Sequence, residues 1–107
     1  MDLGVLNMKK YYHATDYNNL GNILVNGIHP GPDGLVYMCE TETDALKFLY
    51  VRGYRELLVC EIKILKKDEI NVMETFDHSF NFFKCRAFGY KGHIDTSKIT
   101  NYVKYDL

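Results

Sequence analysis

The sequence has little of what a membrane protein, a disulfide-rich protein or a metalloprotein requires. No stretch approaches the ~18 apolar residues of a membrane span, and the first residues lack the basic segment and long apolar core of a secretion signal. The three cysteines form no C-x-x-C pair, and the four histidines are widely spaced. We therefore expect a cytoplasmic protein without a metal site, in which Cys39, Cys60 and Cys85 are buried thiols.

The chain also lacks an excess of charge of either sign. Thirteen Lys and Arg residues against 14 Asp and Glu residues give a net charge of -1, which argues against a general binder of nucleic acids or membrane surfaces. Basic residues gather in the last quarter, and two interpretations remain open for them. They form either an ordinary solvated face or a phosphate-contacting edge, and the residues concerned are Lys84, Arg86, Lys91, Lys98 and Lys104.

Proline is scarce, and no linker divides the chain. Both prolines lie in residues 28–34, a segment that is long enough for a turn but too short to separate domains. With 107 residues, 47% of them hydrophobic, the chain can bury one core. We expect a small single domain that spans residues 1–107. Its aromatic residues are Tyr and Phe without Trp, and we expect most of them to lie in the core.

Periodicity predicts an α+β fold with two early helices and a sheet that is completed late. Helical spacing covers residues 17–26, capped by Thr15 or Asp16 and ended by Gly27, and a second helix begins near Thr41. Period-two alternation from residue 56 to 64 predicts a half-buried strand. The other expected strands cover residues 10–13, 35–39, 82–90 and 101–105, whereas residues 65–81 read as a loop with one helical turn.

Several short segments, taken in order, resemble the ADP-ribosyltransferase superfamily. These are Tyr12-His13-Ala14-Thr15, then Asn26-Gly27-Ile28 at a helix end, then Gly34-Leu35-Val36-Tyr37-Met38, then a helix with Asp44-Ala45, then Leu57 to Ile62. The chain is most similar to the branch with the diphtheria-toxin-like transferases and the RNA 2'-phosphotransferases. The resemblance implies a split antiparallel β-sheet that binds NAD, as substrate, between its first two core strands.

The resemblance also implies the roles of individual residues. His13 would hydrogen-bond the adenosine ribose, Tyr37 would stack on the nicotinamide ring, and Thr15 would sit beside the site. The family's late-strand glutamate falls at or next to Ala87, so Glu74, Asp77 or Glu61 would have to supply the carboxylate. The 2'-phosphotransferase branch uses Arg and His instead, which Arg86 and His78 could provide.

Two functions follow from this resemblance, and the sequence leaves both open. The first is mono-ADP-ribosyl transfer to a protein or nucleic acid, with His13, Tyr37, Glu74 and Asp77 as catalytic residues. NAD or ADP-ribose would then contact His13, Thr15, Tyr37, His78 and Arg86. The second is a non-catalytic module of the same fold that binds a nucleotide, protein or RNA partner. The triplet Asp77-His78-Ser79 lacks the surroundings of a hydrolase nucleophile. If the resemblance holds, His13, Tyr37 and the strand around Arg86 converge on one pocket. His13 and Tyr37 on opposite sides of the sheet would contradict the resemblance.

Overall fold

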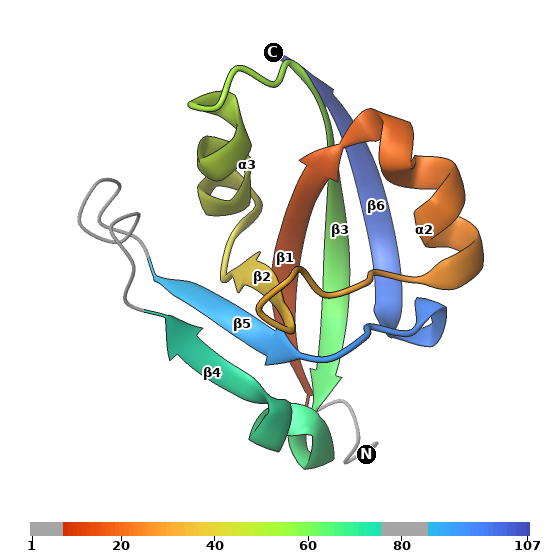
Figure 1. The fold of residues 1–107 in the computed structure, drawn as a ribbon, viewed down its shortest axis with the longest axis vertical. Coiled ribbons are helices and arrows are strands. Elements are labelled where there is room, and N and C mark those ends of the chain that lie inside the picture. The colour runs from red at the N-terminus through yellow and green to blue at the C-terminus, as the bar shows by residue number, and fades with distance from the viewer. Residues whose placement is uncertain (1–7, 76–85) are drawn as a thin grey trace.

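The structure is a computed structural model that describes residues 8–75 and 86–107 (Figure 1). Its helices are α2 (Leu20–Asn26) and α3 (Glu42–Tyr50), with short 3-10 helices η1 (Tyr17–Asn19), η2 (Lys66–Asn71) and η3 (Thr96–Lys98). Its strands are β1 (Met8–Asp16), β2 (Leu35–Cys39), β3 (Glu56–Leu65), β4 (Val72–Thr75), β5 (Ala87–Lys91) and β6 (Ile99–Asp106). The predicted α+β class is confirmed.

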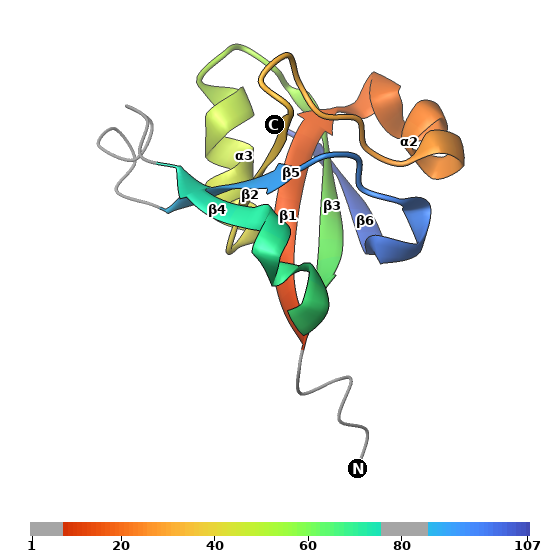
Figure 2. The same cartoon turned by 60° about the horizontal axis from the view of Figure 1, so that its bottom comes forward.

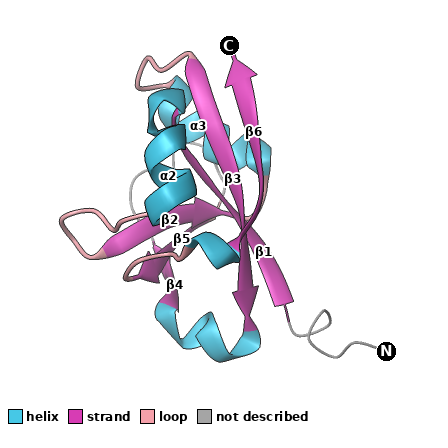
Figure 3. Ribbon diagram, turned by 90° about the vertical axis from the view of Figure 1, so that its right-hand side faces the viewer, coloured by secondary structure: helices cyan, strands magenta, loops and turns pink. Residues whose placement is uncertain are grey.

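The strands form one antiparallel sheet of six strands in the order β4-β5-β2-β1-β3-β6. Strand β1 pairs with β3 along its whole length, from Met8 to Asp16, but with β2 only at Tyr12 opposite Cys39. The sheet therefore consists of two halves joined at a narrow point. Seen from the side in Figure 3, β2 and β5 run across the direction of β1, β3 and β6.

The main core covers one face of the sheet. Strand β3 contributes Leu58, Cys60, Ile62 and Ile64, each 0% exposed, and helix α2 adds Ile23 against the same cluster. The period-two prediction for this strand holds only in its second half. Leu57 and Val59, on the opposite face, are also buried because α3 packs against β1, β2 and β3 there. Helices α2 and α3 stand on either side of β1 (Figures 1 and 2).

The helix ends follow from local sequence signals. The Asp16 side chain accepts a hydrogen bond from the backbone N–H of Asn18, and that of Thr41 accepts one from the N–H of Asp44, which satisfies donors that the helices leave free. Gly27 ends α2 with a φ of 76°, a backbone conformation that favours glycine. The predicted helix start at Thr41 and the predicted stop at Gly27 are confirmed. The helix expected over residues 17–26 is instead η1, capped by Asp16, followed by α2 from Leu20.

Two strand predictions need correction. Residues 65–81 are not simply a loop with a helical turn, because η2 is followed by β4, which pairs with β5 at the edge of the sheet. The strand expected over 82–90 is described only from Ala87, and Cys85 lies outside the described residues. Cys39 and Cys60 are buried, as predicted. Within residues 8–75 and 86–107, no helix is long and apolar enough to cross a membrane.

Candidate functional site

A cavity of about 590 Å³ opens where β1 and β2 separate. It is bounded by both strands, by α3 and by the loop that precedes β2. The polar side chains that line it are those of Tyr12, His13, His29, Asp33, Tyr37 and Arg52. Its apolar wall includes Met38, Ala45, Phe48 and Leu49. A mostly apolar cleft with a few polar groups is typical of sites for small molecules and cofactors.

His13 and Tyr37 meet in this cavity although 24 residues separate them. By strand alternation, His13 shares a face of β1 with Tyr11, whereas Tyr37 shares a face of β2 with Cys39. These are opposite faces of the sheet, because Tyr12 and Cys39 are paired partners and point the same way. Opposite faces are the arrangement expected to contradict the resemblance. The two residues nevertheless both line the cavity, because the strands part beyond that pair.

The hydrogen bond between the two strands fixes the chemistry of His13. Its Nδ1 lies 2.7 Å from the main-chain oxygen of Tyr37, and because a carbonyl oxygen only accepts, Nδ1 carries a proton. Burial lowers the pKa of His13, and the hydrogen bond to Tyr37 opposes this only in part. The imidazole is therefore neutral at pH 7, and Nε2 is a hydrogen-bond acceptor.

Tyr37 presents an accessible ring that is held from two sides. The side chain hydroxyl donates to the carboxylate of Asp33, and the main-chain oxygen accepts from His13. The residue is nevertheless 45% exposed, in a strand whose neighbours Val36 and Met38 are buried. Hydrogen bonds from the Tyr37 hydroxyl and then from the N–H of Leu35 lower the pKa of Asp33, so this carboxylate is ionised at neutral pH. An accessible, oriented aromatic ring is suited to stacking against a flat ligand.

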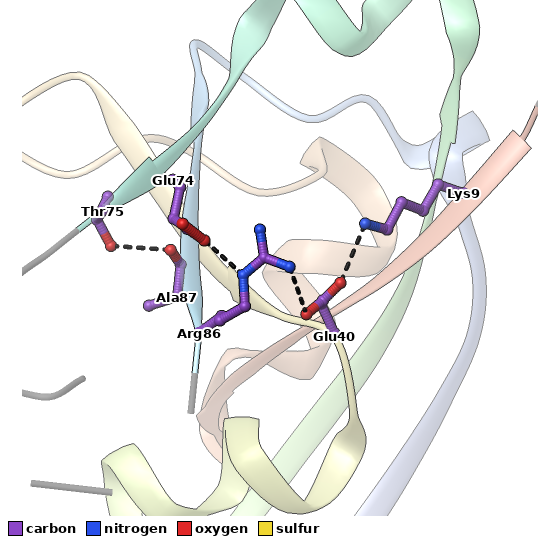
Figure 4. Close-up of polar contacts among 6 residues, drawn as sticks. All are labelled: Lys9, Glu40, Glu74, Thr75, Arg86 and Ala87. Atoms are coloured by element: carbon purple, nitrogen blue, oxygen red, sulfur yellow. Dashed lines mark hydrogen bonds and ion pairs between the residues drawn. The ribbon is translucent and has the colours of Figure 1, made fainter. Parts of the chain in front are cut away.

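The structure places Thr15 and Arg86, two of the other expected binding residues, outside this cavity. Thr15 accepts a hydrogen bond from the side chain of Asn19 at the start of η1. Arg86, expected near the pocket, has its Nε 2.5 Å from Glu74 and a second nitrogen 3.7 Å from Glu40, a network that Lys9 extends (Figure 4). Only the neighbouring Ala87 lines the cavity.

The carboxylates expected to replace the family glutamate are also used elsewhere or not described. Glu74 pairs with Arg86. Glu61 accepts from the hydroxyls of Thr100 and Tyr12 and lies near Lys10, and the hydrogen bond from Thr100 is the largest of the effects that lower its pKa. Asp77 and His78 fall outside the described residues. Among the described residues that line the cavity, Asp33 is the one carboxylate.

Sequence reasoning missed Asp33, His29 and Arg52 as residues of the cavity. The first two lie in the Pro/Gly segment, which the sequence identified only as a turn, and Arg52 follows the apolar stripe of α3. A signal for Asp33 was present, because Asp at this point of a turn can accept from a backbone N–H two residues on, as it does from Leu35 at 3.0 Å. No local signal places Arg52 in the cavity.

Comparisons with known proteins do not assign this chain to a family. A scan against protein-family models gives no match, and a search of curated proteins gives none either. In the part of the chain that the structure describes, no cluster of three or more His, Cys, Asp or Glu side chains could hold a metal ion. The chemistry of the cavity therefore has to be argued from its own residues.

Proposed function

We propose that this protein binds NAD or ADP-ribose in the cleft between β1 and β2 and acts as an ADP-ribosyltransferase-like protein. One observation carries the proposal: a neutral histidine on β1 and an accessible tyrosine on β2 are held together at the point where the sheet divides. The volume of about 590 Å³ lies in the range of sites that hold cofactors.

Each polar group of the cavity has a partner in a dinucleotide. The Nε2 of His13 is an acceptor, and a ribose hydroxyl is a donor, so the two match without any change of protonation. The ring of Tyr37 offers a face on which nicotinamide could stack. Asp33, ionised and adjacent to that ring, attracts the positive charge that develops on the ribose when the bond to nicotinamide breaks.

The transfer that we propose follows from this last feature. The bond between C1 of the nicotinamide ribose and the nicotinamide nitrogen breaks, and its electrons leave with neutral nicotinamide. An acceptor hydroxyl, amine or water then bonds to C1 and loses a proton. The protein stabilises the cation-like transition state rather than the substrate. In this scheme Asp33 replaces the family glutamate, which by the resemblance falls at or next to Ala87.

A second function, that of a non-catalytic module, is favoured by the same alanine. Ala87 lies on β5 at the cavity and offers no carboxylate, while Glu74 is held by Arg86. In that case the cavity binds the nucleotide and no bond breaks. The basic residues of the last quarter give less support to an RNA partner, since Lys98 pairs with Asp68 at 2.7 Å and Lys104 with Asp106 at 3.6 Å.

The binding proposal is tested by melting the protein with NAD or ADP-ribose. Ligand at ~100 times its Kd adds roughly 2.7 kcal/mol, which for a chain of this size raises Tm by about 10 °C. Tyr37→Ala should abolish the shift. Tyr102→Ala is the matched control, because Tyr102 is a strand tyrosine, 47% exposed, outside the cavity lining. The absence of a shift at millimolar ligand in the wild type would refute the proposal.

A second assay separates transfer from binding alone. Wild-type protein is incubated with NAD, and free nicotinamide and the mass of the protein are followed. Release of nicotinamide that Asp33→Asn abolishes supports transfer, because the amide keeps the shape of the side chain but removes its charge. Ligand-induced stabilisation without any release assigns the protein to the non-catalytic class.

A further inference from the structure

The cavity contains a permanent cation whose charge is not neutralised by a neighbour. Arg52 lines the wall just after α3 and is exposed. No ion pair or side-chain hydrogen bond joins Arg52 to another residue within 8–75 and 86–107. The other two arginines both have partners: Arg55 donates to the main-chain oxygens of Tyr50 and Tyr54, and Arg86 pairs with Glu74 and Glu40.

The one carboxylate that lines the cavity in the described structure does not pair with Arg52. Asp33 instead accepts hydrogen bonds from the Tyr37 hydroxyl and from the N–H of Leu35. The two charges also come from different segments, the loop before β2 and the turn after α3. The cavity therefore offers a cation and an anion that do not pair with each other.

We propose that Arg52 binds the diphosphate of the ligand and thereby selects nucleoside diphosphates over uncharged nucleosides. This inference rests on the proposed function, because it concerns the same cleft. A guanidinium presents a planar set of donors that fits phosphate oxygens in pairs. The adjacent wall of Phe48 and Leu49 lowers the local dielectric, which strengthens the attraction to a phosphate. The diphosphate lies toward Arg52, and the ribose next to nicotinamide lies toward Tyr37 and Asp33.

His29 supplies a further polar group of the cavity, from the loop before β2. Its ring packs against that of His93 with the centroids 4.9 Å apart, and the Nε2 of His93 donates to the main-chain oxygen of Asn26 at 2.5 Å. These contacts hold His29 at the wall, where a ring N–H can donate to a phosphate oxygen. The guanidinium remains the group that carries the selectivity, because its charge is permanent.

The experiment measures the Kd of ADP-ribose by calorimetry at two salt concentrations, for the wild type, Arg52→Gln and Lys67→Gln. Arg52→Gln should weaken binding by at least ~10-fold, as expected for a lost charge-assisted hydrogen bond, and should reduce the loss of affinity on adding salt. Lys67→Gln removes the same charge from the exposed surface of η2 and should match the wild type. Because Arg52 has no partner within the described structure, its variant should melt as the wild type does.

The possible results separate this inference from the function on which it rests. Equal affinity in the wild type and Arg52→Gln overturns the role of Arg52 and leaves the binding site standing. Weaker binding with an unchanged salt dependence also overturns it, because Arg52 would then act through the shape of the cavity. A wild type that does not bind ADP-ribose at all removes both proposals. Inorganic pyrophosphate should compete with ADP-ribose for the wild type more effectively than for Arg52→Gln.

Discussion

Replacing Gly27 by alanine should destabilise the protein far more than the same change at Gly34. Both glycines have positive φ values, 76° and 81°, where an L side chain costs roughly 1–2 kcal/mol. At Gly27 an added Cβ would also lie 2.2 Å from the main-chain oxygen of Ile94, whereas at Gly34 it would meet nothing within 4 Å. The difference between the two variants therefore reports the clash together with the ψ of -161° at Gly27, which at a positive φ is essentially restricted to glycine.

The size of that difference follows from what the clash disrupts. The oxygen of Ile94 accepts from the N–H of Ile28 at 2.9 Å, and the N–H of Ile94 donates back to Ile28 at the same distance. Both side chains are buried, at 0% and 4% exposed. Separating this pair weakens two backbone hydrogen bonds, worth about 1–3 kcal/mol together. We expect Gly27→Ala to lose about 3–5 kcal/mol in total.

Thermal unfolding followed by circular dichroism checks the prediction. At about 4 °C for each kcal/mol, Gly27→Ala should melt roughly 12–20 °C below the wild type and Gly34→Ala roughly 4–8 °C below it. Since residues 28–34 form one wall of the cavity, Gly27→Ala should also weaken ligand binding. Equal losses of Tm in the two variants would refute the reasoning, because the contact with Ile94 would then have no energetic consequence.

Two further predictions concern buried titratable groups and the core. Burial lowers the pKa of His13 in the folded state, so the unfolded state binds more protons below pH ~6.5. The stability of the wild type should therefore fall as the pH is lowered from 7.5 to 5.5. The Tm of His13→Gln should fall by less between the same two pH values. If the Tm of the wild type and that of His13→Gln differ by the same amount at pH 7.5 and pH 5.5, this prediction is wrong. Burial raises the pKa of Cys60 to about 11, and the side chain is 0% exposed, so iodoacetamide at pH 8 should label it only after unfolding, as peptide mass spectrometry would show.

Elements with strong local signals could be predicted from the sequence. Strand β2 was predicted as Leu35–Cys39 because a short apolar run follows a Pro/Gly turn, and α3 because Thr41 caps an apolar stripe. These signals are local, and the same residues supply both the pattern and the structure. For β3 the strand itself was predicted, but the burial of its second face was not. Alternation predicted that face to be exposed, whereas α3 covers it.

Strand β4 could not be predicted because its stability comes from elsewhere in the chain. Within Val72–Thr75 no side chain is fully buried, and Met73 is 52% exposed, so the segment lacks alternation. Its backbone pairs with β5, residue Val72 opposite Tyr90 and Thr75 opposite Ala87. Pairing of an edge strand depends on its partner and leaves little pattern in its own sequence.

The cavity was only partly predictable, for a similar reason. The resemblance pointed to His13 and Tyr37, and the structure does bring these two together. It gave no means to place Arg52 or Asp33, because the direction of α3 and of the loop before β2 is set by packing. It also favoured Arg86 because of its type, without showing that two carboxylates already hold it.

The network around Arg86 leads to a final prediction, that Glu74 contributes neither to catalysis nor to much stability. Arg86 has a side chain 54% exposed and bridges Glu74 and Glu40 across the surface of the β5 half of the sheet (Figure 4). Solvent screens such pairs, so a double-mutant cycle of Arg86→Gln and Glu74→Gln should give a coupling below about 1 kcal/mol, and less in high salt. Glu74→Gln should keep the wild-type affinity for ADP-ribose, since neither residue lines the cavity. If Glu74→Gln instead abolishes binding or nicotinamide release while its Tm is unchanged, then the carboxylate of the site is Glu74, and Asp33 loses the role assigned to it here.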